Sequence, residues 1–127
     1  MGEDRAAAAV AAIRGGDVEA LRRLLAAEPG LARARPDGVR TLLHVATDWP
    51  GHRPGGPEAI AILVAAGAQV DAPFAGPAHA ETALHWAASN DDVAALDALL
   101  DRGANIEAPG GVIGGGTPLA DAVAFGQ

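Results

Sequence analysis

The feature that most constrains this chain of 127 residues is a short phrase that occurs three times. It starts with threonine, has leucine two residues later and continues into small apolar residues: Thr41-Leu42-Leu43-His44-Val45-Ala46, Thr82-Ala83-Leu84-His85-Trp86-Ala87-Ala88 and Thr117-Pro118-Leu119-Ala120-Asp121-Ala122. After the first two copies comes an apolar run that closes on Gly-Ala. A unit of this length cannot bury its own apolar face, so successive copies must stack. The repeat therefore predicts a solenoid of helix pairs.

Local rules place some helix boundaries within the repeats. Thr82 and Thr117 are suited to cap a helix, because a threonine oxygen accepts a hydrogen bond from a free backbone amide. Pro118 suits the first helical position, where the missing N–H is not needed. Gly67 and Gly103 can adopt the left-handed backbone that ends a helix. Each predicted second helix therefore stops at a Gly-Ala pair.

The repeated phrase resembles the ankyrin repeat, which reads T-P-L-H-x-A-A, then G-H, a leucine-rich helix and G-A-D-V-N-A. The resemblance covers nearly the whole chain and implies an all-α fold, with about three and a half helix-turn-helix repeats joined by β-turn fingers. We expect one domain over residues 1–127, with repeats at 6–36, 37–80, 81–116 and, in part, 117–127. The first repeat, with a helix over 18–27, would be the N-terminal cap. The resemblance also implies that His44 and His85 tie adjacent repeats together through hydrogen bonds.

The spacing of the phrase locates departures from the regular repeat. Thr41 and Thr82 are 41 residues apart and Thr82 and Thr117 are 35 apart, whereas the family period is about 33. We assign most of the first excess to residues 49–57, which are rich in proline and glycine and would lie between the two helices of the second repeat. The remainder falls in the finger over 72–81.

Charge is unevenly distributed along the chain. The formal net charge is −7, with seven Arg against six acidic residues over 1–40 and two Arg against ten acidic residues over 41–127. An acidic surface repels phosphate backbones, so we expect no nucleic-acid partner. The same acidity favours a basic protein or peptide partner.

Composition excludes several classes of site. The absence of cysteine rules out disulfides, thiolate zinc sites and thiol nucleophiles. No apolar run reaches the length of a membrane span, and residues 1–5 carry acids where a signal peptide needs positive charge. We therefore expect no membrane partner and a cytoplasmic location. No hydrolase or metal-binding spacing of His and acidic residues occurs, so we predict no cofactor and no metal ligand.

The resemblance implies a ligand surface on the concave side, built from finger tips and the exposed ends of the first helices. By alignment, the predicted binding residues are Asp48, Trp49, His52, Arg53, Trp86, Ser89, Asn90 and Phe125. A large aromatic side chain such as Trp49 at an exposed position is a recognised binding anchor. The alternative is that Trp49 folds back onto the proline-rich insertion and holds it. Trp86 is expected to be half-buried against the neighbouring repeat.

The insertion also admits a chemical hypothesis. His52 could titrate as a general acid or base, with Asp48 or Asp92 orienting its ring. The alternative is a solvated acidic edge in which Asn90 and Asp91 cap the helix that starts near residue 92. If His52 pointed into solvent, far from any carboxylate, the enzyme hypothesis would fail.

The first functional hypothesis is a protein-protein interaction module that grips a partner with its concave face. A small-molecule-binding protein or acid-base enzyme, with a pocket lined by Asp48-Trp49-Pro50-Gly51-His52, is the alternative. The phrases are similar to those of stand-alone bacterial ankyrin-repeat proteins, from which no activity can be transferred. The chain stops at Gln127, before the second helix of a fourth repeat. Either it is a fragment, or another chain covers the apolar side of Val123 and Phe125, so we expect self-association or a partner at this end.

Overall fold

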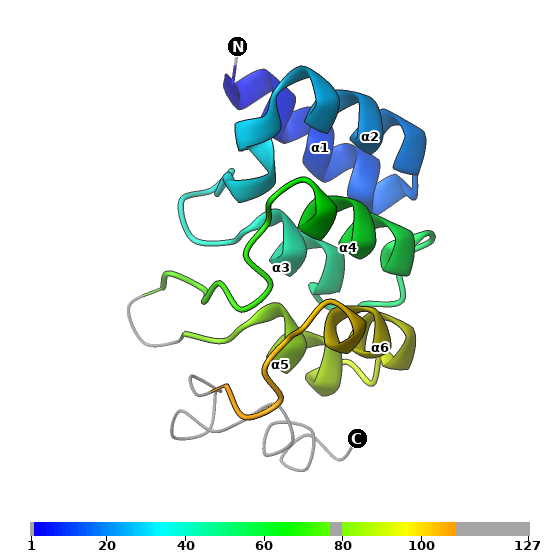
Figure 1. Ribbon diagram of the computed structural model, residues 1–127, viewed down its shortest axis with the longest axis vertical. Coiled ribbons are helices and arrows are strands. Elements are labelled where there is room, and N and C mark those ends of the chain that lie inside the picture. Colours follow the sequence, from blue (N-terminus) through cyan, green and yellow to red (C-terminus); the bar gives the residue numbers. More distant parts are fainter. Residues whose placement is uncertain (1, 77–79, 109–127) are drawn as a thin grey trace.

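The computed structural model describes residues 2–76 and 80–108, and in this part of the chain the regular structure is entirely helical. The elements are α1 (Gly2–Gly15), α2 (Val18–Ala27), the 3-10 helix η1 (Pro29–Arg33), α3 (Leu42–Thr47), α4 (Gly56–Ala65), α5 (Ala83–Ser89) and α6 (Val93–Asp101). The pairs α1/α2, α3/α4 and α5/α6 stack along the long axis of the molecule (Figure 1). The predicted all-α solenoid is confirmed.

The first helices of the second and third pairs begin at a threonine cap reinforced by histidine. The N–H of His44 donates to Thr41 Oγ1 at 3.2 Å, and the N–H of Thr41 donates to His44 Nδ1 at the same distance. Thr82 and His85 repeat this reciprocal arrangement, with distances of 3.4 and 3.0 Å. Two free amides are thus satisfied at each helix start. The predicted cap at Thr82 is confirmed, whereas those involving residues 117 and 118 lie outside the described residues.

The second helices end as predicted at Gly67 and Gly103. Their φ angles are 114° and 93°, in the region that favours glycine. At the first of these ends, the N–H of Gly67 donates to Val64 O at 3.0 Å and the N–H of Ala68 donates to Leu63 O at 2.9 Å. This pair of bonds is the Schellman motif, which satisfies the last carbonyls of the helix and turns the chain.

The first pair extends further toward the N-terminus than the repeat pattern indicates. We expected the first repeat to start near residue 6, but α1 begins at Gly2. The helix thus adds residues 2–5 to the predicted repeat, and the run of alanines over 6–9, the strongest helix former, supports the turns that follow. The helix expected over 18–27 is present as α2.

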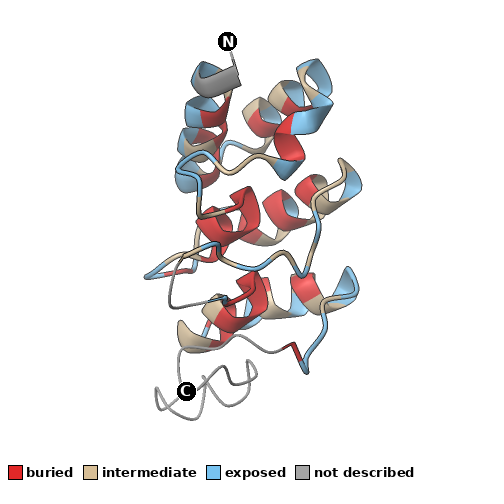
Figure 2. Cartoon of the chain, turned by 90° about the vertical axis from the view of Figure 1, so that its left-hand side faces the viewer, coloured by how far each residue is buried: buried red, intermediate tan, exposed pale blue. Residues whose placement is uncertain are grey.

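The core lies between successive helix pairs (Figure 2). Fully buried leucine and isoleucine side chains from several helices fill it, including Leu21, Leu42, Ile60, Leu84 and Leu99. His44 adds a polar link between the second and third pairs, because its Nε2–H donates to the carbonyl oxygen of Glu81 at 2.8 Å. This linking role of His44, which the resemblance implied, is confirmed. Among residues 2–76 and 80–108, no helix combines the length and apolar character needed to cross a membrane.

Two kinds of connection leave the helices on opposite edges of the stack. The long segments after α2 and α4 project to one side, and the loop over 48–55, which joins α3 to α4, lies on the other (Figure 1). This loop is the predicted insertion. It carries Asp48, Trp49, His52 and Arg53, which are half of the predicted binding residues.

Candidate functional site

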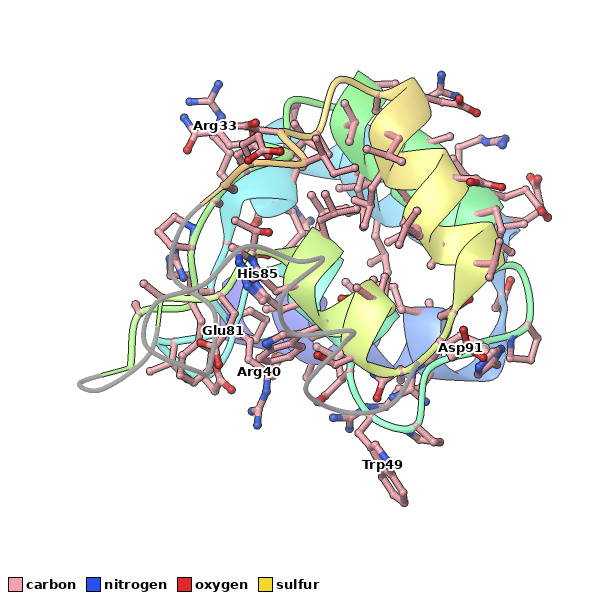
Figure 3. The ribbon with its side chains drawn as sticks, turned by 90° about the horizontal axis from the view of Figure 1, so that it is seen from below. Arg33, Arg40, Trp49, Glu81, His85 and Asp91 are labelled. Carbon is pink, nitrogen blue, oxygen red and sulfur yellow. The ribbon has the colours of Figure 1, made fainter. Side chains whose placement is uncertain are left out.

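Trp49 projects from the loop over 48–55 and is 78% exposed. Figure 3 shows its side chain pointing away from the helices. Its backbone N–H donates to Asp48 Oδ1 at 2.9 Å, while the indole ring extends outward. The alternative in which Trp49 folds back onto the insertion is therefore wrong, since the ring does not pack against the loop.

The loop that carries Trp49 is fastened to the helices by hydrogen bonds. Gly51 N–H donates to Asp48 O at 2.7 Å and closes a tight turn around Trp49. His52 N–H donates to Asp92 Oδ2 at 2.7 Å, a contact that spans 40 residues of sequence. Arg53 Nε donates to Val45 O at 3.4 Å. These bonds fix the backbone on both sides of the indole.

Asp92 connects the loop to the third helix pair. Its buried carboxylate accepts from His52 N–H through Oδ2 and from Ala95 N–H, at 3.2 Å, through Oδ1. The second bond makes Asp92 the N-cap of α6. The expectation that Asn90 and Asp91 cap this helix was wrong, because Asn90 ends α5 and Asp91 has a left-handed backbone with φ of 54°.

Asn90 binds the other side of the same junction. Its side-chain amide donates to Thr47 O at 2.9 Å, and its own carbonyl accepts from His52 Nε2–H at 3.1 Å. The ends of α3 and α5 and the insertion therefore form one hydrogen-bonded unit. The backbone that carries Trp49 is therefore fixed before any partner arrives.

The acid-base hypothesis receives no support from this geometry. The His52 ring is 61% exposed, and its Nδ1 lies 3.9 Å from Asp92 Oδ1. That carboxylate already accepts two backbone N–H groups, so it serves as an anchor. Asp48 does not face His52, because its Oδ2 lies 3.4 Å from Arg40 Nε. The structure thus brings His52, Asn90 and Asp92 together and leaves Asp48 and Trp49 apart from them.

A second group of side chains adjoins the loop, and of its members sequence reasoning identified Trp86 but missed Arg40 and Phe74. The guanidinium of Arg40 lies 6.0 Å from the centre of the Trp86 ring and pairs with both Asp37 and Asp48. Phe74 lies on the same indole, with ring centres 5.6 Å apart. Trp86 is half-buried, as expected. Arg40 directly precedes the repeated phrase, and this position is the one signal in the sequence that could have pointed to it.

His44 lies beneath this aromatic group and is buried in its neutral form. Its ring centre is 4.8 Å from that of Trp86 in an edge-on arrangement. Burial above all, together with the positive charges of Arg35 and Arg40, lowers the pKa of His44 to about 4. The bond to the Glu81 carbonyl and the charge of Asp48 act in the opposite direction but do not compensate. His44 is therefore a structural group with no free nitrogen for chemistry.

The remaining predicted site residues are placed as follows. Ser89 and Arg53 are half-buried beside the same loop and helix end. Phe125 and the open C-terminal end expected to self-associate lie outside the described residues. Among residues 2–76 and 80–108, no cluster of three or more His, Cys, Asp or Glu side chains could hold a metal ion.

Comparison with known proteins bears on the fold of this site. A family model described as ankyrin repeat matches residues 80–110, which include α5 and α6. A search of curated proteins found no match. The matched segment contains Asn90 and Asp92, the residues that hold the insertion.

Proposed function

This chain belongs to the ankyrin-repeat family, and from that premise we propose that it binds a partner protein or peptide with Trp49 as the anchor. The observation that carries the proposal is an indole, 78% exposed, on a loop that is hydrogen-bonded to two helix pairs through the His52 backbone and the Arg53 side chain. Exposed tryptophan is costly in water and is enriched at binding hot spots. A fixed backbone reduces the ordering cost of association. Interaction with other proteins is also the general use of this repeat.

The binding surface extends from Trp49 toward Trp86. Asp48 adjoins Trp49 in sequence and pairs with Arg40, whose guanidinium lies over the Trp86 ring. On this chain of contacts we propose that the two indoles belong to one binding surface. We define the Trp49 face as Asp48, Trp49, His52, Arg53, Trp86, Ser89 and Asn90.

Charge indicates the chemistry of the partner. The chain from residue 41 onward carries ten acidic residues against two Arg, so its field attracts positive charge. We therefore propose a basic partner segment that also offers an apolar pocket or side chain to the indole. As in the sequence analysis, we expect the protein to meet this partner in the cytoplasm of a bacterium.

The test is selection of binding peptides from a random library on the wild-type chain, followed by affinity measurements on variants. Trp49→Ala should weaken a selected peptide about 30-fold, which corresponds to the roughly 2 kcal/mol of a hot spot. Ile106→Ala is the matched control, because Ile106 is also apolar and is 51% exposed but lies outside the Trp49 face. Equal affinity of wild type and Trp49→Ala for every selected peptide would refute the proposal.

A salt titration tests the charge of the partner separately. A basic peptide should bind more weakly as ionic strength rises from about 0.05 to 0.3 M, because screening shortens the reach of the acidic field. Selected peptides that are acidic and insensitive to salt would contradict this part of the proposal while leaving Trp49 as the anchor.

A further inference from the structure

A small cleft lies at the junction of the first and second helix pairs, away from the Trp49 face. Its volume is about 80 Å³, and it is lined by Ala32, Arg33, Arg35, Thr41, Leu43, Ala68, Gln69 and Ala72. This is room for several water molecules or for one small oxyanion. Figure 3 shows Arg33 and Trp49 at opposite edges of the molecule, so the cleft is a separate feature.

Each of the two arginines at the cleft donates one hydrogen bond to a backbone carbonyl. Arg33 Nε donates to Gly67 O at 2.9 Å, and Arg35 Nη1 donates to Val39 O at 2.7 Å. A guanidinium has five N–H groups in a planar fork, so each arginine keeps further donors for a ligand. The two guanidinium groups are thus positioned before a ligand binds, and each keeps N–H groups that can donate to it.

The positive charge at this cleft is not neutralised by carboxylates of the described residues. The ion pairs formed among residues 2–76 and 80–108 do not include Arg33 or Arg35. The acidic residues nearest in sequence form ion pairs with other arginines: Glu28 pairs with Arg5 at 3.2 Å, and Asp37 pairs with Arg40. Two arginines with no carboxylate partner among the described residues therefore line one small cleft of a chain with a net charge of −7.

Asp71, two residues after Gln69, also turns its carboxylate away from the cleft. Asp71 Oδ1 accepts the backbone N–H of Asn105 at 2.9 Å, a bond that directs its carboxylate toward the third repeat. Gln69 adds an amide to the lining, and an amide can donate to an anion. The lining is therefore cationic and rich in donors.

We propose that this cleft binds a phosphate group, supplied either by free inorganic phosphate or by a phosphorylated side chain of a partner. A phosphate monoester carries a charge of about −1.5 to −2 at neutral pH, which matches two arginines. The planar guanidinium fork also fits the spacing of phosphate oxygens, as an ammonium group does not. The cleft is small enough to enclose one such group and too small for a nucleotide.

The test is a titration with inorganic phosphate in a chloride buffer of low ionic strength. Binding is measured by isothermal calorimetry and by changes in the backbone amide NMR shifts. We expect saturable binding at one site, with the largest shifts at residues 32–35 and 68–72. Arg33→Gln and Arg35→Gln should each weaken binding at least tenfold. Arg23→Gln is the matched control, because it removes the same charge from an exposed position on α2.

Further variants and ligands sharpen the result. Arg33→Lys keeps the charge but loses the fork, so it should bind with intermediate affinity. An amide NMR spectrum of Arg33→Gln that matches wild type away from the cleft would show that its loss of binding is not unfolding. Equal binding of O-phosphoserine and inorganic phosphate would support recognition of the group on a partner, and binding of inorganic phosphate alone would support the free ion. Binding that does not saturate, or an equal loss in Arg23→Gln, would overturn the site. Trp49→Ala should leave phosphate affinity unchanged.

Discussion

Acidification should destabilise this protein through His44. In the folded chain the imidazole is fully buried, and burial lowers its pKa to about 4, whereas an unfolded chain has the ordinary value of 6.5. As the pH falls below 6.5, the unfolded state takes up a proton first, so the equilibrium shifts toward it. The stability that neutral His44 contributes is therefore complete above pH 6.5 and is lost progressively as the pH falls toward 4.

The size of the effect follows from the two pKa values. A difference from 6.5 to about 4, at 1.36 kcal/mol per pH unit, amounts to roughly 3 kcal/mol of unfolding free energy. Within the window the free energy of unfolding should fall by about 1.4 kcal/mol for each pH unit. A loss of this size is large against the 5–15 kcal/mol that is typical of natural domains.

The assay is urea unfolding of wild type and His44→Gln at several pH values between 7 and 4. His44→Gln will be less stable at pH 7, because it loses buried bonds to Thr41 and to the Glu81 carbonyl. Its free energy of unfolding should nevertheless depend less steeply on pH, by about 1.4 kcal/mol per unit within the window. The other three histidines are present in both proteins, so their contributions cancel in the comparison. Equal slopes would refute the assignment.

The titration of Asp37 should not contribute to the pH dependence of the unfolding free energy in this window. Burial acts to raise its pKa, but hydrogen bonds from the backbone amides of Arg40 and Val39 and the Arg40 guanidinium lower it below the ordinary 3.8. A carboxyl group with a lowered pKa contributes stability above its unfolded value and loses it as the pH falls through the folded value. The contribution of Asp37 is therefore lost below the window of His44.

Two further predictions concern helix ends. Asp91→Gly should stabilise the chain by about 0.5–1 kcal/mol in urea unfolding, since Asp91 has a left-handed φ of 54° that glycine adopts without strain. Asp91→Ala is the control and should not stabilise the chain. A gain in stability with alanine would show that backbone strain is not the cause. Gly16→Ala should cost at least about 2 kcal/mol, because φ is 76° and a Cβ would lie 2.7 Å from Pro54 Cβ. Gly15→Ala, which meets no atom within 4 Å, should raise the melting temperature, and the reverse order of the two glycine variants would contradict the backbone argument.

Much of the fold could be predicted because its determinants are local. Thr82 caps a helix through an amide three residues away, and Gly67 ends a helix through carbonyls of its last turn. These interactions depend on a few neighbouring residues, so their sequence signals are direct. The recurrence of the same phrase then specified stacking, because each unit has an apolar face that only a neighbour can cover.

The candidate site was predicted less well, because it depends on contacts between distant residues. Sequence reasoning joined His52 to Asp48 or Asp92 as equals, and the structure joins it to Asp92 alone. The choice is made by the backbone at Gly51 and His52, where consecutive positive φ angles of 74° and 57° turn the loop toward the third helix pair. Asp48 therefore forms its ion pair with Arg40.

By itself, the sequence determined the repeat, its helix starts and ends and the excess of acid after residue 40. Only the tertiary structure decided that Trp49 is exposed and that Arg33 and Arg35 line one cleft with Gln69. The physical reason is range: capping and helix termination act within one turn of chain, whereas exposure and charge pairing depend on which segments the stacked repeats bring together in space.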